Sequence, residues 1–182
     1  MIRSIVALWL ILSTAATSLP QETRTVFAMK TGILLRMHVV AQDDTPEMQQ
    51  LKLSVRDAVQ QTYAQGQPTG AMLYEAAAML PALRQAAQEA ALQEGFTGAV
   101  TVTIQRASFD QRSLDGLTIP AGEYPALMIC LGRAQGHNWW GLIDPKLALQ
   151  CASAGDDAPA WDWSFAAFWR CLLAFLQGGE QL

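Results

Sequence analysis

Two adjacent tryptophans, Trp139 and Trp140, constrain the fold more than any other feature, because each ring needs both an apolar surface and a partner for its N–H. Upstream of them, Pro120-Ala121-Gly122 forms a turn signal that leads into the apolar run from Glu123 to Leu131. Such a run bounded by turn residues predicts a strand. We expect this strand to be central in its sheet, with residues 132–136 turning the chain into the tryptophan pair.

Alternating apolar residues predict two further strands. Residues 32–41 would form the first, with Ile33, Leu35, Met37 and Val39 facing the core, while Arg36 and His38 take the other face. Residues 100–104 alternate valine and isoleucine with threonine, which is typical of a half-buried strand. Residues 108–116 are expected to be a loop that holds at most a short edge strand.

Helix signals separate these strands. Thr45-Pro46-Glu47 combines an N-cap, a proline at the first helical position and an acidic first turn, and predicts a helix to about Tyr63. An alanine-rich helical stretch follows over residues 71–94, with a break expected near Leu80 because Pro81 lacks a backbone donor. The order indicates a single α+β domain in which helices back a small mixed sheet.

The two ends of the chain differ from this domain. Residues 1–18 carry a basic start, an apolar run and small residues, which is typical of a secretory signal peptide; an uncleaved anchor is the alternative. Residues 19–31 are interpreted as an irregular lead-in linker, residues 32–152 as the α+β domain, and residues 153–182 as a polar breaker plus an aromatic amphipathic helix. That helix either packs on the domain or lies on a membrane surface. We expect a protein secreted across the cytoplasmic membrane.

Composition excludes several classes of protein. Apolar residues make up 51% of the 182-residue chain and charged residues 15%, so a sizeable core is expected and a disordered chain is not. The net charge is −4 without a basic cluster, which disfavours nucleic-acid binding. Three cysteines, Cys130, Cys151 and Cys171, permit one bridge plus a free thiol or three buried thiols, and we favour the second.

No catalytic, cofactor or metal motif is found in the sequence. The chain has two histidines, His38 and His137, and a Cys130–His137 nucleophile pair would require contact across a turn. We therefore predict a protein that is not an enzyme and has no cofactor. An exported peptidoglycan-binding or cell-wall-active enzyme is the alternative.

Polar and aromatic residues instead suggest a binding surface. His38 is interpreted either as a hydrogen-bonded structural histidine or as part of a recognition patch with Arg36, Glu123 and one of Arg56 and Asp57. The Asn138-Trp139-Trp140 unit has three interpretations: core, a partner-docking group, or a platform that stacks on sugar. The candidates for partner binding are Arg36, His38, Arg56, Asp57, Glu123, Tyr124, Asn138, Trp139 and Trp140.

Five blocks in order resemble the stage II sporulation protein R family. They are Leu35–Ala41, Asp44–Glu47, Leu51–Val59, Pro120–Leu127 and Gly136–Trp140, and together they reach from about Leu34 to Trp140. The chain departs from the family pattern at Gly141 and Ala148, where the family usually has cysteine.

The resemblance implies a function as well as a fold. Members of the family are exported from the forespore into the space between the two cell membranes. There they activate a membrane-embedded aspartic protease of the mother cell, which processes a sigma-factor precursor. The resemblance thus implies a signalling protein whose partner is that protease.

Overall fold

A four-stranded mixed sheet in the order β2-β5-β1-β6 is the centre of the computed structural model, which describes residues 21–68, 72–114 and 117–144. The strands are β1 (Arg36–Val40), β2 (Val100–Phe109), β5 (Gly122–Leu131) and β6 (Asn138–Leu142). Strand β1 runs parallel to β5 and antiparallel to β6, and β2 runs antiparallel to β5. Together with the helices below, this sheet confirms the expected α+β class.

Strand β5 is central, as its long apolar run predicted. It pairs with β2 on one side and β1 on the other, with Leu127 opposite both Ile104 and Met37. Leu127, Ile129 and Leu131 are fully buried. A strand that is covered on both faces and both edges needs such an uninterrupted apolar sequence.

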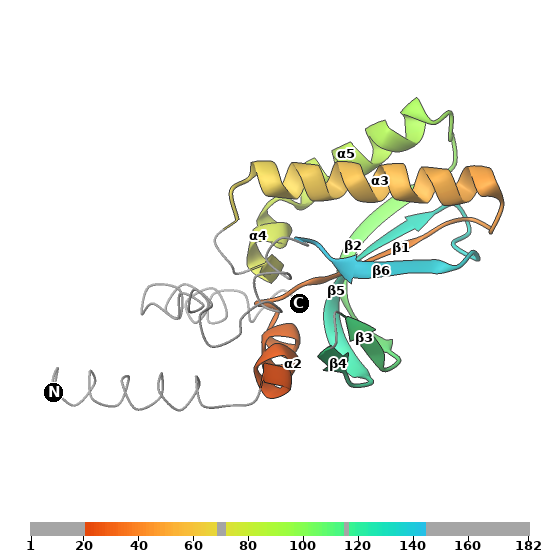
Figure 1. The fold of residues 1–182 in the computed structure, drawn as a ribbon. Coiled ribbons are helices and arrows are strands. Elements are labelled where there is room, and N and C mark those ends of the chain that lie inside the picture. The colour runs from red at the N-terminus through yellow and green to blue at the C-terminus, as the bar shows by residue number, and fades with distance from the viewer. Residues whose placement is uncertain (1–20, 69–71, 115–116, 145–182) are drawn as a thin grey trace, which may run out of the picture.

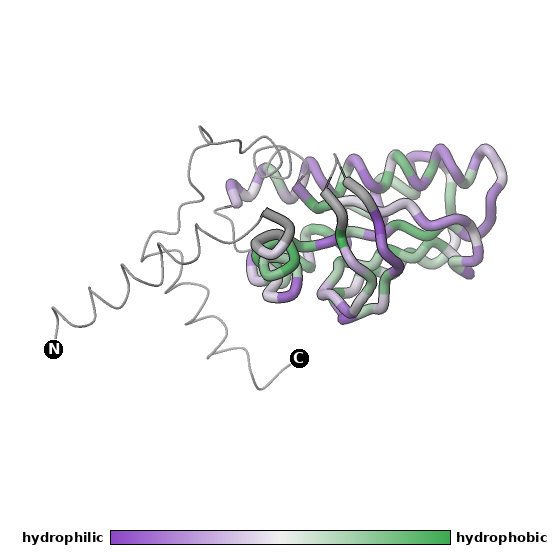
Figure 2. Tube along the Cα trace, turned by 60° about the horizontal axis from the view of Figure 1, so that its bottom comes forward, coloured by the Kyte–Doolittle hydropathy of each residue, from purple (hydrophilic) through white to green (hydrophobic). Residues whose placement is uncertain are grey.

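Helices α3 (Pro46–Gln65) and α5 (Leu80–Gln93) pack against each other and cover one face of the sheet (Figure 1). Helix α3 begins as expected, with Thr45 Oγ1 accepting a hydrogen bond from the backbone N–H of Met48 at 3.4 Å. Its apolar stripe turns toward the strands, and Figure 2 shows hydrophobic and hydrophilic segments alternating along it. The core between these layers includes Met37, Val39, Leu51, Val55, Val59, Leu83, Ala87, Val102 and Ile129.

The alanine-rich stretch is broken where Pro81 predicted. Helix α4 (Met72–Ala78) ends before Met79, and α5 begins at Leu80 with the proline in its first turn. A proline is tolerated there because the first N–H groups of a helix have no intrahelical partner. After α5 the chain reverses at Gly95, whose φ of 77° is readily available only to glycine.

Two segments differ from the sequence-based expectation. Residues 21–31, expected to be irregular, form helix α2 (Gln21–Thr31), which buries Ala28 and Met29 in the core and contacts β5. Strand β2 continues to Phe109, which pairs with Gly122, and a hairpin of β3 (Arg112–Leu114) and β4 (Leu117–Ile119) follows. Burial of the helix and cross-strand pairing supply stabilisation that local sequence does not reveal.

The remaining expectations fall on other parts of the chain. The signal segment at residues 1–18, the C-terminal segment at residues 153–182, Cys151 and Cys171 lie outside the described residues. Cys130 is a free thiol. Within the described ranges, no helix combines the length and hydropathy needed to cross a bilayer.

Candidate functional site

Strand β6 directs its two tryptophans to opposite faces of the sheet, as neighbouring residues of a strand must. Trp139 packs against the core on the α3 side, and the Arg56 guanidinium carbon lies 5.2 Å from its ring centroid. Trp140 lies on the opposite face, where the guanidinium carbon of Arg36 is 5.7 Å from its ring centroid. The tandem tryptophans are therefore two separate indoles on either side of one edge strand.

On the α3 side, Trp139, Arg56 and Asp57 form a small surface group that we call the indole platform. Arg56 Nη2 and Asp57 Oδ1 are 2.6 Å apart, and the Asp57 side chain is 61% exposed. Because this ion pair is in contact with solvent, it contributes little to folding. The Arg56–Asp57 pair is therefore free to serve binding without a large effect on stability, whereas Trp139 also packs on the core.

Helix α3 also caps the ends of the β6 edge. Lys52 Nζ donates to the carbonyl oxygen of His137 at 3.0 Å, and Gln60 Nε2 donates to the carbonyl oxygen of Leu142 at 3.0 Å. Lys52, Arg56 and Gln60 lie four residues apart on α3 and follow the rim next to β6. Polar side chains placed in this way satisfy edge carbonyls that would otherwise have no partner in the sheet.

The opposite face carries the Arg36 cluster, which we define as Arg36, His38, Phe109, Tyr124, Asn138 and Trp140. Arg36 is only 2% exposed. Its guanidinium carbon lies 4.1 Å from the ring centroid of Phe109 and 5.4 Å from that of Tyr124. Within the described part of the chain, Nε and Nη1 of Arg36 are buried without a hydrogen-bond partner. The cation is thus in contact with aromatic rings, and two of its three nitrogens lack an acceptor among the described residues.

His38 lies two residues further along β1 on the same face. Its ring stacks on Phe109 with 4.2 Å between the ring centroids, and its Nδ1 lies 2.6 Å from Nδ2 of Asn138. If the neutral ring carries its proton on Nε2, the Asn138 amide donates this bond. Nε2 is then a buried donor, and it too has no partner among the described residues. The hydrogen-bonded interpretation of His38 agrees with this geometry.

Electrostatics keep His38 neutral. Burial, which is the largest cause, and the positive charges of Arg36 and Arg112 together lower the pKa of His38 to about 4, against the raising effect of the Asn138 hydrogen bond. Burial likewise lowers the pKa of Arg36, with Tyr124 opposing the shift and Arg112 adding to it. None of the groups that shift these two pKa values is a carboxylate.

The rings compensate for only part of the cost of burying Arg36. A cation–π contact contributes about 0.5–2 kcal/mol, whereas removing an unpaired ion from water costs several kcal/mol even after relaxation. Native proteins normally give such buried donors an acceptor. The Arg36 cluster is therefore an unusual arrangement that packing alone does not explain.

The expected patch of Arg36, His38 and Glu123 with Arg56 or Asp57 is wrong as a single surface. Arg56 and Asp57 belong to the indole platform on the α3 side, whereas Arg36 and His38 lie on the other face. Glu123 is exposed and, as the strand neighbour of Tyr124, points away from the cluster. Strand alternation and helix placement divide the residues between two faces.

Tyr124 has a structural partner within its own strand–turn unit. Its hydroxyl donates to the carbonyl oxygen of Pro120 at 2.9 Å, and its ring stacks beside Phe109. Phe109 and Arg112 were not among the sequence-based candidates, because residues 108–116 were interpreted as a loop. Ala107 and Phe109 keep the two-residue spacing of a strand, but on the opposite face from Val100, Val102 and Ile104, so the alternation seen at the start of β2 did not reveal them.

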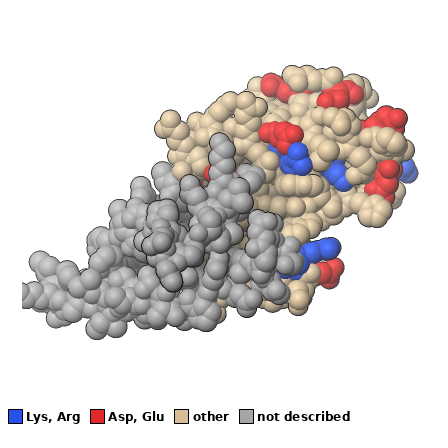
Figure 3. Space-filling model, in the orientation of Figure 1, with Lys and Arg blue, Asp and Glu red and all other residues tan. Residues whose placement is uncertain are grey.

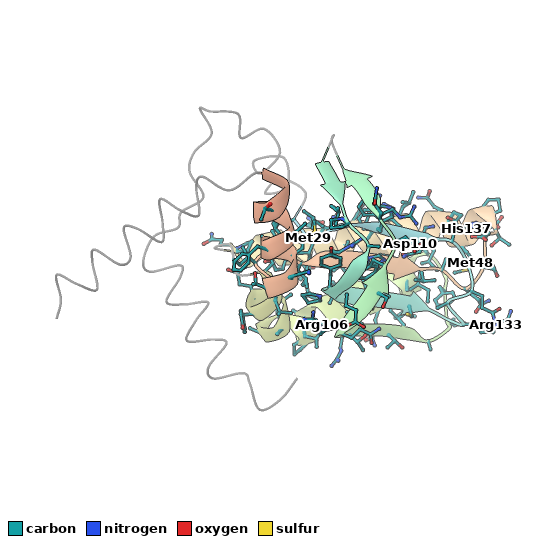
Figure 4. The ribbon with its side chains drawn as sticks, turned by 90° about the horizontal axis from the view of Figure 1, so that it is seen from below. Met29, Met48, Arg106, Asp110, Arg133 and His137 are labelled. Atoms are coloured by element: carbon teal, nitrogen blue, oxygen red, sulfur yellow. The ribbon has the colours of Figure 1, made fainter. Side chains whose placement is uncertain are left out.

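His137 and Cys130 do not form an activated pair. Asp44 binds His137, with Oδ1 accepting from its backbone N–H at 2.6 Å and Oδ2 lying 2.5 Å from Nδ1. Figure 4 shows His137 and Met48 toward one end of the domain, away from Met29. Burial raises the pKa of Cys130, which disfavours the thiolate that a nucleophile requires.

Charge and metal-ligand chemistry add no second site. On the face seen in Figure 3, acidic and basic side chains occur singly or in small groups, separated by uncharged surface. Among residues 21–68, 72–114 and 117–144, no three histidine, cysteine or acidic side chains gather in a way that could hold a metal ion. The indole platform and the Arg36 cluster, which flank β6, remain the candidate site.

Comparison with known proteins relates this site to one family. The family model described as Stage II sporulation protein R (spore_II_R) matches residues 31–153, which include both groups of candidate residues. Over 126 residues the chain is 31% identical to Stage II sporulation protein R of Bacillus subtilis (strain 168), with 67% of this chain and 56% of that protein covered. The chain thus spans little more than half the length of this relative. No solved structure matches the chain.

Proposed function

This chain belongs to the stage II sporulation protein R family, and we propose that it is an exported signal that activates a membrane-embedded aspartic protease during sporulation. In this role it works by binding and carries no catalysis of its own. The protease would then process the precursor of a mother-cell sigma factor. The resemblance of five ordered blocks to this family supports the proposal, and the geometry suggests where the protease binds.

The β6 edge is the proposed docking surface, and the arrangement of its two indoles is the observation that supports this choice. Trp139 with Arg56 lies on one side of the strand, and Trp140 above Arg36 lies on the other. Both tryptophans are half-buried and Asn138 is exposed. Tryptophan and arginine are the residues that most often dominate protein–protein binding energy.

The same arrangement disfavours the alternative of a peptidoglycan-binding or cell-wall-active protein. That alternative required both indoles on the wall of one cleft containing two converging titratable groups. Strand alternation places the indoles on opposite faces. A protein partner that binds along an edge strand can contact both faces of the sheet, whereas a single sugar ring cannot.

Deletion of the gene in the source organism tests the proposed role directly. The sigma-factor precursor should accumulate unprocessed, and the full chain supplied from a second locus should restore processing. A double variant, Trp139→Ala with Trp140→Ala, should be exported in normal amounts and fail to restore it. Normal precursor processing in the deletion strain would refute the proposed function. Full rescue by the double variant would refute the proposed docking at β6, but not the proposed function.

A further inference from the structure

The Arg36 cluster presents a positive charge with buried donors and no acceptor. Two guanidinium nitrogens of Arg36 and Nε2 of His38 are buried without a hydrogen-bond partner within the described ranges. Both side chains project from the same face of β1 and contact Phe109. Arg112 adds positive charge nearby, while the exposed carboxylate of Glu123 points away. This chemistry is complementary to an oxyanion.

The cluster lies close to the surface although Arg36 itself is buried. Phe109 and Trp140, whose rings cover the guanidinium, are only half-buried. Phe109 ends β2, and the next residues, Asp110 and Gln111, are exposed. Arg36 therefore lies one side chain below the surface and one strand in from the β6 edge. A group that reaches Arg36 from this side has to displace the ring of Phe109 or of Trp140.

We propose that the Arg36 cluster is a carboxylate-binding site that receives one acidic side chain of the protein partner. The proposal rests on the proposed function for the identity of that partner, but binding of a carboxylate can be tested without it. The guanidinium of Arg36 would donate charge-assisted hydrogen bonds to the carboxylate, and the rings would shield the pair from water. An aspartate or glutamate side chain is the smallest group on a protein that meets these needs.

Replacement of Arg36 separates this role from a structural one. An apolar residue of similar length in place of an unpaired buried ion is expected to leave stability unchanged or raised. Arg36→Met should therefore fold with a melting temperature equal to or above that of the wild type. If Arg36 were instead a structural element held by its three rings, the same variant would melt at a clearly lower temperature, which would overturn the proposal.

Acetate is a suitable probe for the carboxylate itself. Thermal unfolding of the full chain is measured in sodium acetate and in sodium chloride at equal ionic strength. The wild type should melt about 3 °C higher in acetate, as expected for a weak ligand of the native state at ten times its Kd. Arg36→Met should show no difference between the salts, and Arg36→Lys, which keeps the charge, should show a reduced one.

Arg56→Met is the matched control, because Arg56 also stacks on a tryptophan but is paired with Asp57. It should respond to acetate as the wild type does. The proposal would be overturned if the melting temperature of the wild type did not rise specifically in acetate. It would also be overturned if the rise persisted in Arg36→Met, because acetate would then be an adventitious ion only.

The partner is tested in sporulating cells in which wild-type complementation has already restored precursor processing. Arg36→Met should be exported in normal amounts and fail to support processing. Full processing with Arg36→Met would show that the partner does not supply the carboxylate, and would overturn that part of the proposal. Failure of the wild-type chain to support processing would count against the proposed function and leave the acetate result unaffected.

Discussion

Acidification should destabilise this protein through His38 well above the pH at which carboxylates titrate. The folded state holds the pKa of His38 at about 4, against 6.5 for an ordinary histidine, mainly because the ring is buried. A pKa lowered by folding means that the unfolded chain binds the proton more readily than the native state does. Stability is therefore fully present above pH 6.5 and is lost as the pH falls toward 4.

The size of the effect follows from the two pKa values. One pKa unit corresponds to about 1.4 kcal/mol, so the shift from 6.5 to about 4 amounts to about 3 kcal/mol once both forms have titrated. At pH 5 the unfolded histidine is almost fully protonated and the folded one is still mostly neutral, which gives a loss of about 2 kcal/mol. The pKa values of Asp43 and Asp44 are lowered below their ordinary value of 3.8, so these groups do not titrate in this range.

Urea unfolding of the full chain at pH 7.5 and pH 5 measures this loss. His38→Gln is the informative variant, because glutamine does not titrate and its Oε1 can still accept a hydrogen bond from the Asn138 amide. It should lose about 2 kcal/mol less than the wild type between the two pH values. His137→Gln is the matched control, since the His137 side chain is 87% exposed, and it should behave as the wild type.

Equal losses in the wild type and His38→Gln would refute the reasoning. Such a result would mean that the ring of His38 reaches water, or gains a counter-charge, in the native state.

Four further substitutions test the fold around the site. Val59→Ala should lower the free energy of unfolding by about 2 kcal/mol in urea titration, because it opens a cavity beneath α3 at a fully buried position. Gly132→Ala should lower the free energy of unfolding by about 1–2 kcal/mol in the same assay, since φ is 58° at this position. Gly95→Ala should lower it by a similar amount if backbone conformation is the cause. Gln60→Leu should cost about 1 kcal/mol and speed amide hydrogen exchange in β6, because the carbonyl oxygen of Leu142 loses its partner; unchanged exchange would contradict the capping role.

Local sequence signals predicted the parts of the fold that are determined locally. The helix start at Thr45-Pro46, the break at Pro81 and the central strand β5 all depend on signals within a few residues. Helix α2 was missed because its stabilisation comes from burying Ala28 and Met29 against distant residues. A propensity-based interpretation has no access to such contacts.

The candidate site was predicted in its residues but not in its geometry. Arg36, His38, Asn138 and Trp140 were all candidates, and the structure brings them together. The alternation in β1 predicted that Arg36 and His38 lie on the face away from the core, but no local pattern predicts that Arg56 lies over Trp139 on the other face. Phe109 was missed because its position beside Arg36 depends on strand pairing with Gly122, which lies beyond the β3–β4 hairpin in the sequence.

The strand order has a consequence for when the chain can fold. Strand β1 lies near the start of the described residues, yet its neighbours are β5 and β6, so Arg36 pairs with Ala126 and Leu142. A nascent chain that has not yet emerged as far as β5 cannot close its sheet, and bringing such distant segments together is slow. The polypeptide should thus remain loosely organised until late in synthesis, which is the condition in which a chain can be threaded through a translocation channel.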